Sequence, residues 1–527
     1  MQAARRRRVV ISAVTAVAVA AAGFVSWRLL TPAAPPTSVP STAASPISCS
    51  DATAVTVAAA PAVAPVLAAL AETLSTEETG PCAAFTIQSV EPFAVSGTIG
   101  TAAAPDAWVT DSTEWVARAG SLAGGQLTVA EPFASTGIVV AMPRAGAEQV
   151  GAEAKWASAL TAGTPVRVPD PTRSAAGAWA LGAAAAGLPA DRLTEVIRAS
   201  AASPAPGLAA VADSQTPLGV VVSAAQLLAF NESNGGRALA AVAPVDGAPS
   251  LNYRLITVTD EPKVAGLIAD LAAYLGTEDA KSALSTAGFT TPGGPDPELP
   301  SPLYGQVVEA SAPDAQALKT VRSTWAAASP KRQTLLVLDV SGSMLRRTDQ
   351  GTRLEVIQAA ALESVASLPP TNRVGLWAYS LHIGNKGDDF RQLLGAAPIG
   401  DTEHLRDVRK QMAGLTRVVG GGRGLYDTIV ASYQRARSIY APGQQNTVVV
   451  IADGPNDDDY GASLNDARAK LKRLVDARNP IRMEIIGFGS EPKAEALESF
   501  ATMTGGRYRS AAEPGDLLPA LRAALGG

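Results

Sequence analysis

Histidine is almost absent from this chain of 527 residues, in which only His382 and His404 occur. Most general acid–base catalysis and many zinc sites depend on histidine, and neither residue stands at a spacing typical of metal ligands. The sequence also contains no HExxH, GxSxG, Walker A or CxxC motif. We therefore expect a non-enzymatic protein without catalytic residues. The polar helical stretch around His404 predicts a solvated surface histidine, and His382 is expected in a loop after a strand.

Strongly basic segments are also missing after the first eight residues. Charged residues make up 17% of the chain and the net charge is −5, so no concentrated positive patch is available for nucleic acid. Aromatic residues are only 5%, but hydrophobic residues reach 47%, which indicates Ala-rich globular domains rather than disorder. At this length we expect roughly two to four domains.

Cysteine is limited to Cys49 and Cys82. In an exported chain these two residues would form one disulfide. Such a bond would close a loop of roughly 33 residues and stabilise the fold by about 3 kcal/mol. Two buried free thiols are the alternative.

The N-terminus has the pattern of a membrane-targeting segment. Four arginines at residues 5–8 precede an uncharged run at residues 9–27, and about 20 apolar residues suffice to cross a bilayer. Positive charge keeps such an end in the cytoplasm. We therefore expect residues 1–30 to form a single-pass transmembrane signal anchor in the cell membrane, with the bulk of the chain extracytoplasmic. A signal peptide cleaved near residues 20–22 is the alternative. The Pro/Ala/Ser-rich stretch at residues 31–48 predicts an extended linker.

Short strand patterns alternate with helical patterns in the first globular region, residues 49–310. Residues 54–59 and 85–90 have the character of strands, and residues 63–74 have a helical pattern. Residues 137–142 form another apolar strand, which a proline ends. Strands that alternate with helices predict an α/β sheet.

Three segments of this region carry a family resemblance: Pro105–Ser112 (PDAWVTDS), Thr136–Pro143 (TGIVVAMP) and Asp170–Gly177 (DPTRSAAG). With the order of the elements, they make the region similar to a two-lobed, type II extracellular solute-binding protein. The resemblance implies a periplasmic-binding-protein-like fold with a ligand cleft between its lobes, lined by loop hydroxyls and backbone N–H groups.

The residues carried over to that cleft by position are Ser96, Thr98, Asp111, Ser112, Thr172 and Ser174. Their alternative role is ordinary turn and N-cap chemistry. One departure concerns the loop Ala59–Pro61, because oxyanion binders of this type often carry a hydroxyl there.

A specific motif opens the C-terminal region, residues 331–527, which follows a connecting segment at residues 311–330. An apolar strand ends in Asp339, and Ser341 and Ser343 follow it in the pattern D-x-S-x-S. This region resembles a von Willebrand factor A-type (VWA) domain, which implies a doubly wound, Rossmann-like α/β fold. The rest of the pattern agrees, with helices at residues 354–368 and 425–440 and strands at residues 374–379, 447–454 and 483–489.

Four side chains in this region form a candidate metal site. In a doubly wound sheet, ligands bind beyond the carboxyl ends of the strands. Asp339 ends one such strand, with Ser341 and Ser343 just after it, and Asp453 ends another. Their oxygen atoms suit Mg²⁺ or Ca²⁺ rather than Zn²⁺. The resemblance implies a metal-ion-dependent adhesion site (MIDAS), where a carboxylate of a partner protein completes the coordination.

This chain departs from the family at the MIDAS loops. Arg423 stands where the family usually has threonine, and Ala452 replaces the threonine of the Thr-Asp-Gly sequence. A guanidinium beside two carboxylates can neutralise them as a cation would. We therefore consider that Arg423 replaces the ion partly or fully; the alternative is that Arg423 points outward and the loop alignment is off by one or two residues. The acidic run at residues 456–459 is either a second cation site or a solvated loop.

As a whole, the sequence resembles actinobacterial-type bacterial proteins that join a substrate-binding domain to a VWA domain. We expect a membrane-anchored, extracytoplasmic protein of the binding or adhesion type, which engages an unidentified protein partner through the MIDAS-like face and does not bind nucleic acid. The alternative is a receptor for a small molecule or anion, linked to transport or sensing.

Overall fold

The computed structural model describes residues 52–77, 80–123, 127, 129–203 and 205–526. The predicted signal anchor, the linker and Cys49 lie outside these residues, so the anchor and the Cys49–Cys82 disulfide stay predictions. Among the helices that are described, none combines the length and the apolar character needed to cross a membrane.

The first globular region contains two separate five-stranded sheets. The first has the strand order β2-β1-β3-β9-β4, in which β1 is parallel to β2 and β3, and β9 is antiparallel to β3 and β4. Its strands are β1 (Thr53–Ala59), β2 (Ala83–Ser89), β3 (Ala107–Thr110), β4 (Ala134–Thr136) and β9 (Leu251–Thr257). The helices of this lobe are α2 (Ala64–Thr76), α3 (Pro92–Ser96), α4 (Thr113–Ala123), α11 (Pro262–Tyr274) and α12 (Glu278–Thr286).

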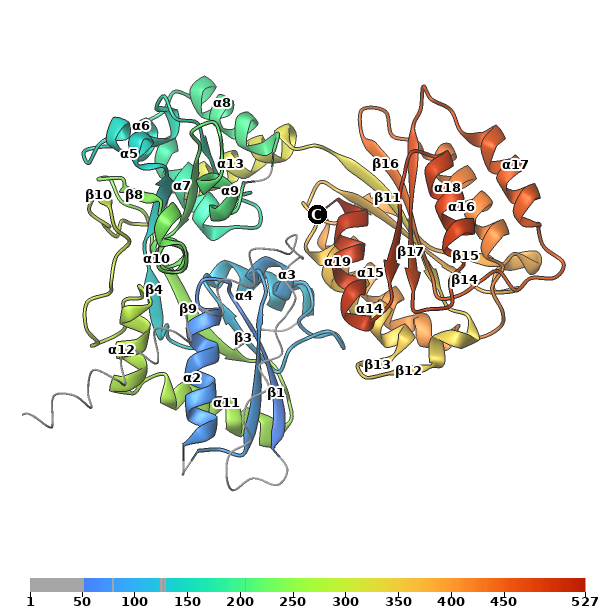
Figure 1. Ribbon diagram of the computed structural model, residues 1–527, viewed down its shortest axis with the longest axis horizontal. Coiled ribbons are helices and arrows are strands. Elements are labelled where there is room, and N and C mark those ends of the chain that lie inside the picture. The colour runs from blue at the N-terminus through green and yellow to red at the C-terminus, as the bar shows by residue number, and fades with distance from the viewer. Residues whose placement is uncertain (1–51, 78–79, 124–126, 128, 204, 527) are drawn as a thin grey trace, which may run out of the picture. The chain divides into compact units, whose positions relative to one another are not determined.

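The second sheet has the order β10-β8-β5-β7-β6. Its strands are β5 (Ile138–Met142), β6 (Val166–Arg167), β7 (Gly219–Ser223), β8 (Ala240–Ala243) and β10 (Leu303–Gly305). The helices of this lobe are α5 (Arg144–Val150), α6 (Trp156–Thr161), α7 (Ala175–Ala185), α8 (Ala190–Ala201), α9 (Leu208–Ala212), α10 (Ala224–Ser233) and the 3₁₀ turn η2 (Gly235–Arg237). Only Gly137 separates β4 from β5, so the chain passes from one sheet to the other at that residue (Figure 1). The predicted α/β character is confirmed.

The predicted connecting segment contains a helix, α13 (Ala315–Ala328), that packs on α7 and α8. Val321 and Trp325 on this helix are buried in the hydrophobic core of the first region. The segment is therefore part of the solute-binding-like fold, and the last domain begins with β11 at Arg332.

The C-terminal domain is built on a six-stranded sheet with the order β15-β14-β11-β16-β17-β18, in which only the edge strand β15 is antiparallel to its neighbour. The strands are β11 (Arg332–Asp339), β14 (Arg373–Tyr379), β15 (Phe390–Pro398), β16 (Gln445–Ala452), β17 (Ile481–Phe488) and β18 (Tyr508–Ala511), with a small hairpin of β12 (Arg347–Thr348) and β13 (Gly351–Thr352). The helices are α14 (Arg353–Ala366), α15 (Thr402–Gly414), α16 (Leu425–Ser438), α17 (Leu464–Leu474), α18 (Ala494–Met503) and α19 (Pro514–Leu525), with 3₁₀ turns η3 (Gly342–Leu345), η4 (Asn385–Gly387) and η5 (Leu415–Arg417).

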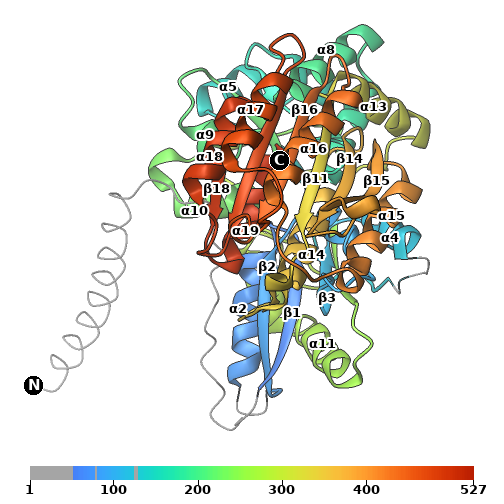
Figure 2. The ribbon, with the colours of Figure 1, turned by 90° about the vertical axis from the view of Figure 1, so that its right-hand side faces the viewer.

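Strand β11 lies between β14 and β16 and is buried on both faces (Figure 2). Leu336 and Leu338 pack in one core with residues of α14, α15 and α19. Leu335 and Val337 pack in the opposite core with residues of α16, α17 and α18. This alternation explains why residues 335–338 of the strand are all apolar, since a parallel sheet covered by helices on both faces has no solvated side.

The prediction of a solvated His404 is wrong. Only 9% of the residue is exposed, and the ring nitrogen Nε2 lies 2.8 Å from the carbonyl oxygen of Val374. A carbonyl can only accept, so Nε2 donates and holds the start of α15 against β14. The polar neighbours of His404 in sequence conceal this packing. His382 lies in a turn after β14, as predicted.

Candidate functional site

Asp339 and Asp453 meet at the carboxyl edge of the C-terminal sheet. Asp339 is the last residue of β11, and Asp453 directly follows β16, its parallel neighbour. Both residues are fully buried. Parallel strands end at the same edge of a sheet, so the topology alone brings these two carboxylates together.

Each oxygen of Asp339 accepts a hydrogen bond from the protein. Oδ1 accepts from the backbone N–H of Ser341 at 2.8 Å. Oδ2 accepts from the hydroxyl of Tyr379 at 2.8 Å and from the backbone N–H of Asp453 at 3.3 Å. Burial, followed by the negative charge of Asp453, raises the pKa of Asp339 to about 6.

The two serines of the motif form a short chain of hydroxyls that ends on Asp453. The Oγ atoms of Ser341 and Ser343 lie 2.9 Å apart, and Ser343 donates to Oδ1 of Asp453 at 2.8 Å. The structure therefore brings together all four residues that the sequence assigned to the metal site.

Arg423 points into this group of oxygen atoms. Its Nη1 donates to Oγ of Ser343 at 2.7 Å and to Oδ1 of Asp453 at 3.2 Å. Its Nε donates to the carbonyl oxygen of Pro455 at 2.7 Å, and Nη2 lies 3.4 Å from a carboxylate oxygen of Asp457. The side chain is only 14% exposed. Of the two orientations considered for Arg423, the structure has the inward one.

A second arginine, Arg353, reaches the same carboxylate from the opposite side. Its Nη1 lies 3.1 Å from Oδ2 of Asp453 and 2.6 Å from Oε2 of Glu491, which also pairs with Arg346. The sequence analysis missed Arg353 and Glu491. The only available signal was that Arg353 begins the helix after the D-x-S-x-S loop, since no local motif links it to a glutamate 138 residues away.

Gly454 leaves room for the inward position of Arg423. A β-carbon at residue 454 would lie 2.8 Å from Cζ of Arg423 and 3.0 Å from Nε. The glycine next to Asp453 therefore allows the guanidinium to approach the strand end.

The hydrogen bonds at this site occupy the oxygen atoms that a divalent ion would need. Such an ion would bind the hydroxyl of Ser343 and the carboxylate of Asp453, but both already accept hydrogen bonds from Arg423. Asp339 likewise accepts three hydrogen bonds from protein donors. With Arg423 in this position, the four residues do not fit a bound divalent ion.

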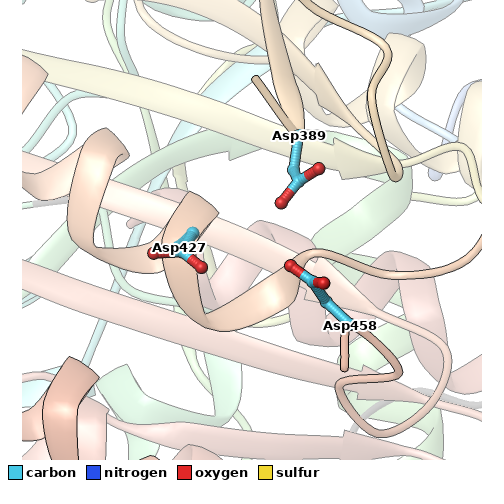
Figure 3. A group of neighbouring side chains, drawn as sticks. All are labelled: Asp389, Asp427 and Asp458. Carbon is cyan, nitrogen blue, oxygen red and sulfur yellow. The ribbon is translucent and has the colours of Figure 1, made fainter. Parts of the chain in front are cut away.

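A separate group of carboxylates lies near the same edge of the sheet. Asp389, Asp427 and Asp458 place oxygen atoms within 4.8 Å of one another (Figure 3). Each also accepts a backbone N–H, from His382 at 2.9 Å, from Ala462 at 2.6 Å and from Tyr460 at 3.0 Å, respectively. These hydrogen bonds explain the three carboxylates as groups that close loops. A cation site in the acidic run at residues 456–459, to which Asp458 belongs, stays a prediction.

Each predicted cleft hydroxyl makes a hydrogen bond near its own position in the chain, and Ser96 also accepts from Nε of Arg118 at 3.0 Å. Ser96 donates to the carbonyl of Phe93 at 2.6 Å, and Thr98 donates to that of Val95 at 2.9 Å. The remaining three accept or donate next to helix starts: Ser112 accepts from Glu114 N, Thr172 donates to Asp170, and Ser174 caps α7 through Gly177 N. Turn and cap chemistry accounts for all five, so their role as ligand contacts stays a prediction.

Asp111, the sixth cleft candidate, differs because it is an acid in a buried setting. Its Oδ1 accepts from Nε1 of Trp115 at 3.0 Å. Burial, followed by the charge of Glu91, raises the pKa of Asp111 to about 7. A carboxyl of this kind would exchange its proton near neutral pH.

Comparison with known families assigns both parts of the chain. Residues 55–290 match the family of bacterial extracellular solute-binding proteins, and residues 334–456 match the von Willebrand factor type A domain. Two uncharacterized proteins from two strains of Mycobacterium tuberculosis are 29% identical to this chain over 257 residues. The match covers 45% of this chain and 35% of each relative, so the chain spans about a third of the length of these curated relatives.

Solved structures of both kinds are also similar to the chain. The sulfate-binding protein SubI from Mycobacterium tuberculosis matches with 16% identity and a TM-score of 0.38, over 48% of this chain and 94% of that protein. A von Willebrand factor type A protein from Catenulispora acidiphila matches with 16% identity and a TM-score of 0.29, over 37% of this chain and 42% of that protein. The pilus adhesin SpaC from Lactobacillus rhamnosus GG matches with 12% identity and a TM-score of 0.30, over 37% of this chain and 30% of that one. These TM-scores add no weight to either assignment.

The family matches agree with the two-sheet region and with the parallel sheet that ends in Asp339 and Asp453. Both domain types support a binding or adhesion role. The chain therefore joins a bacterial extracellular solute-binding domain, over residues 55–290, to a von Willebrand factor type A domain, over residues 334–456.

Proposed function

We propose that this protein is a non-enzymatic, extracytoplasmic binding protein whose VWA domain engages a protein partner without a divalent ion at its MIDAS-like face. The observation that carries the proposal is the bridge from Arg423 to Ser343 and Asp453, at 2.7 and 3.2 Å. In this proposal the guanidinium supplies the positive charge that Mg²⁺ or Ca²⁺ would supply in the family.

Charge balance supports this assignment. One guanidinium contacts each oxygen of Asp453, since Arg423 lies against Oδ1 and Arg353 against Oδ2. A buried carboxylate needs such partners, because an unpaired buried charge costs several kcal/mol. Arginine is permanently protonated and is weakly hydrated, so it suits a fixed position inside a loop cluster.

The surroundings of the site support a protein partner. Leu345, in the turn after Ser343, is 55% exposed, and Tyr460, in the loop after Asp453, is 99% exposed. The side chain of Arg346 is 56% exposed. Aromatic residues and arginine are enriched in protein interfaces. A partner would contact these side chains directly instead of supplying a carboxylate to an ion.

The placement outside the cytoplasm and the membrane anchor are part of this proposal. The run of four arginines and the uncharged residues 9–27 support a signal anchor. The match of residues 55–290 to an extracellular solute-binding family supports the same side of the membrane.

A second candidate function is that of a receptor for a small solute. The same family match favours it, because two lobes built on separate sheets are the arrangement from which such receptors form a ligand cleft. In that case the VWA domain would be the docking part of the receptor.

Calorimetric titration of Mg²⁺, Mn²⁺ and Ca²⁺ into the full chain tests the metal-free assignment. We expect no saturable binding to the natural protein and clear binding to Arg423→Thr, which restores the family's hydroxyl. The matched control is Arg482→Thr, an exposed arginine at the opposite end of the sheet on β17, which should behave as the natural protein does. Saturable binding to the natural protein, lost on Asp453→Asn, would refute the proposal.

A further inference from the structure

Two arginines from different domains, the half-buried Arg118 and the buried Arg409, lie close enough for their charges to interact. Arg118 belongs to α4 of the solute-binding domain, and Arg409 belongs to α15. Nε of Arg118 donates to Oγ of Ser96 at 3.0 Å, and its guanidinium carbon lies 4.3 Å from the centre of the Phe93 ring. Nη2 of Arg409 donates to the carbonyl oxygen of Ile99, which is also in the solute-binding domain.

Each of these arginines has a nitrogen with no partner. Nη2 of Arg118 and Nη1 of Arg409 are buried and make no hydrogen bond within the described part of the chain. Arg409 as a whole is only 8% exposed. Burial and the charge of Arg409 lower the pKa of Arg118 to about 10, so the two cations repel one another.

The other polar contacts between the two domains also bring in positive charge. Arg406 on α15 donates to the carbonyl oxygen of Ser121, and Arg173 of the solute-binding domain donates to that of Ser367 at 2.6 Å. Arg173 is paired with Asp170 at 3.3 Å. Carbonyl oxygens carry no net charge, so the bonds of Arg406 and Arg409 do not compensate their guanidinium groups. A cluster of arginines that is short of anions is an unfavourable way to join two surfaces.

A hollow of about 290 Å³ adjoins Arg118 at this contact. The solute-binding domain and the VWA domain both line it, with Phe93, Arg118 and Thr172 on one side and Pro370 and Gly400 on the other. Glu114 also lines it, but its carboxylate is paired with Arg322 at 2.6 Å. The hollow therefore offers the guanidinium of Arg118, and the one acid among its lining residues is already paired.

We propose that a small inorganic oxyanion binds at this contact, held by Arg118 and Arg409, and fastens α15 of the VWA domain to the solute-binding domain. The planar guanidinium fork suits an oxyanion, because two N–H groups can bond two oxygen atoms in parallel. The ion would satisfy the two unpaired nitrogen atoms and remove the repulsion between the arginines. This site uses none of the residues around Asp453, so its test is independent of the test of the proposed function.

The test is calorimetric titration of sodium sulfate and, separately, sodium phosphate into the full chain, at an ionic strength held constant with sodium chloride. We expect saturable one-to-one binding of at least one of the two oxyanions, and the comparison of the two salts tells which oxyanion the site prefers. Arg409→Gln should weaken binding by about tenfold or more, because a charge-assisted hydrogen bond is lost. The control Arg417→Gln changes an exposed arginine just beyond α15 and should leave the affinity unchanged.

Arg118→Lys keeps the charge but removes the fork, and it decides the matter if Arg409→Gln does not fold, as judged by circular dichroism. We expect this variant to bind the oxyanion more weakly than the natural protein. Heats of the natural protein that match the sodium chloride blank would overturn the proposal. So would an unchanged affinity in a folded Arg409→Gln variant, because the oxyanion would then bind elsewhere.

Discussion

Nη1 of Arg423 lies 3.2 Å from Oδ1 of Asp453. The contact joins two loops at the carboxyl edge of the sheet, one before α16 and one after β16. The same guanidinium also donates to Ser343. In the function we propose, this fixed guanidinium takes the place of an exchangeable divalent ion.

Replacement of this arginine should make the fold depend on metal. Arg423→Thr leaves Asp453 with one cationic partner, Arg353, so we expect the free energy of unfolding to fall by about 1–3 kcal/mol without added metal. Millimolar Mg²⁺ should recover most of that loss, because the bound ion stabilises only the folded state. Chemical denaturation with and without Mg²⁺ measures both effects. A variant as stable as the natural protein without Mg²⁺ would show that the arginine contributes nothing.

Filling the space beside the guanidinium should have a similar but milder effect. In Gly454→Ala the new methyl group would lie 2.8 Å from Cζ of Arg423, so the flexible side chain must move out. We expect the variant to fold and to gain weak affinity for Mn²⁺, which paramagnetic broadening of NMR signals near Ser343 can detect. Gly266→Ala, at an open position on helix α11 of the solute-binding domain, serves as the control for a general effect of alanine. Absence of broadening in a folded Gly454→Ala variant would argue against steric control of the site.

The hydroxyl of Tyr379 should contribute strongly to stability. It donates to Oδ2 of Asp339 at 2.8 Å in a fully buried position. Tyr379→Phe leaves a buried carboxylate oxygen with one donor fewer, and we expect a loss of about 1–3 kcal/mol in urea denaturation. Tyr460→Phe, at a residue that is 99% exposed, should change stability by less than about 0.5 kcal/mol. Equal effects of the two substitutions would contradict the hydrogen-bond assignment.

Asp111 should make stability depend on pH. Burial, followed by the charge of Glu91, raises its pKa to about 7, whereas an unfolded Asp titrates near about 4. Between these values the folded state binds more protons than the unfolded state, so the contribution of Asp111 to stability falls as pH rises and levels off above pH 7. Asp111→Asn cannot titrate, yet it can still accept the hydrogen bond of Trp115.

We therefore expect Asp111→Asn to gain stability relative to the natural protein, by about 1–3 kcal/mol, as pH increases from 4 to 7. Urea denaturation across this range measures the difference. Asp260→Asn, at an exposed loop residue, is the matched control and should run parallel to the natural protein. If the Asp111→Asn curve is also parallel, Asp111 has the same pKa in the folded and unfolded states, and burial does not raise it.

The sequence was sufficient to predict the α/β class, both domain types and the four oxygen-bearing residues that meet at the sheet edge, because each depends on a local pattern. The D-x-S-x-S loop follows its strand directly, and the five residues before Asp453 are all apolar. Arg353 and Glu491 escaped prediction because they reach Asp453 from separate elements, and only the folded sheet edge brings them together.

The two remaining differences have the same physical origin. His404 has polar neighbours in sequence, but the packing of α15 on β14 buries it. The orientation of Arg423 depends on Gly454, 31 residues further on, which leaves space for the guanidinium. Periodicity and motif spacing describe single elements. They cannot predict the burial or orientation of a side chain when contacts between elements decide it.

Diffraction from crystals of the protein grown with Mn²⁺, recorded to locate the anomalous signal of manganese, tests the central claim most directly. The account predicts that the guanidinium of Arg423 bridges Ser343 and Asp453 and that no manganese peak lies between Asp339 and Asp453. A manganese peak coordinated by Ser341, Ser343 and Asp453, with Arg423 turned to solvent, would contradict it.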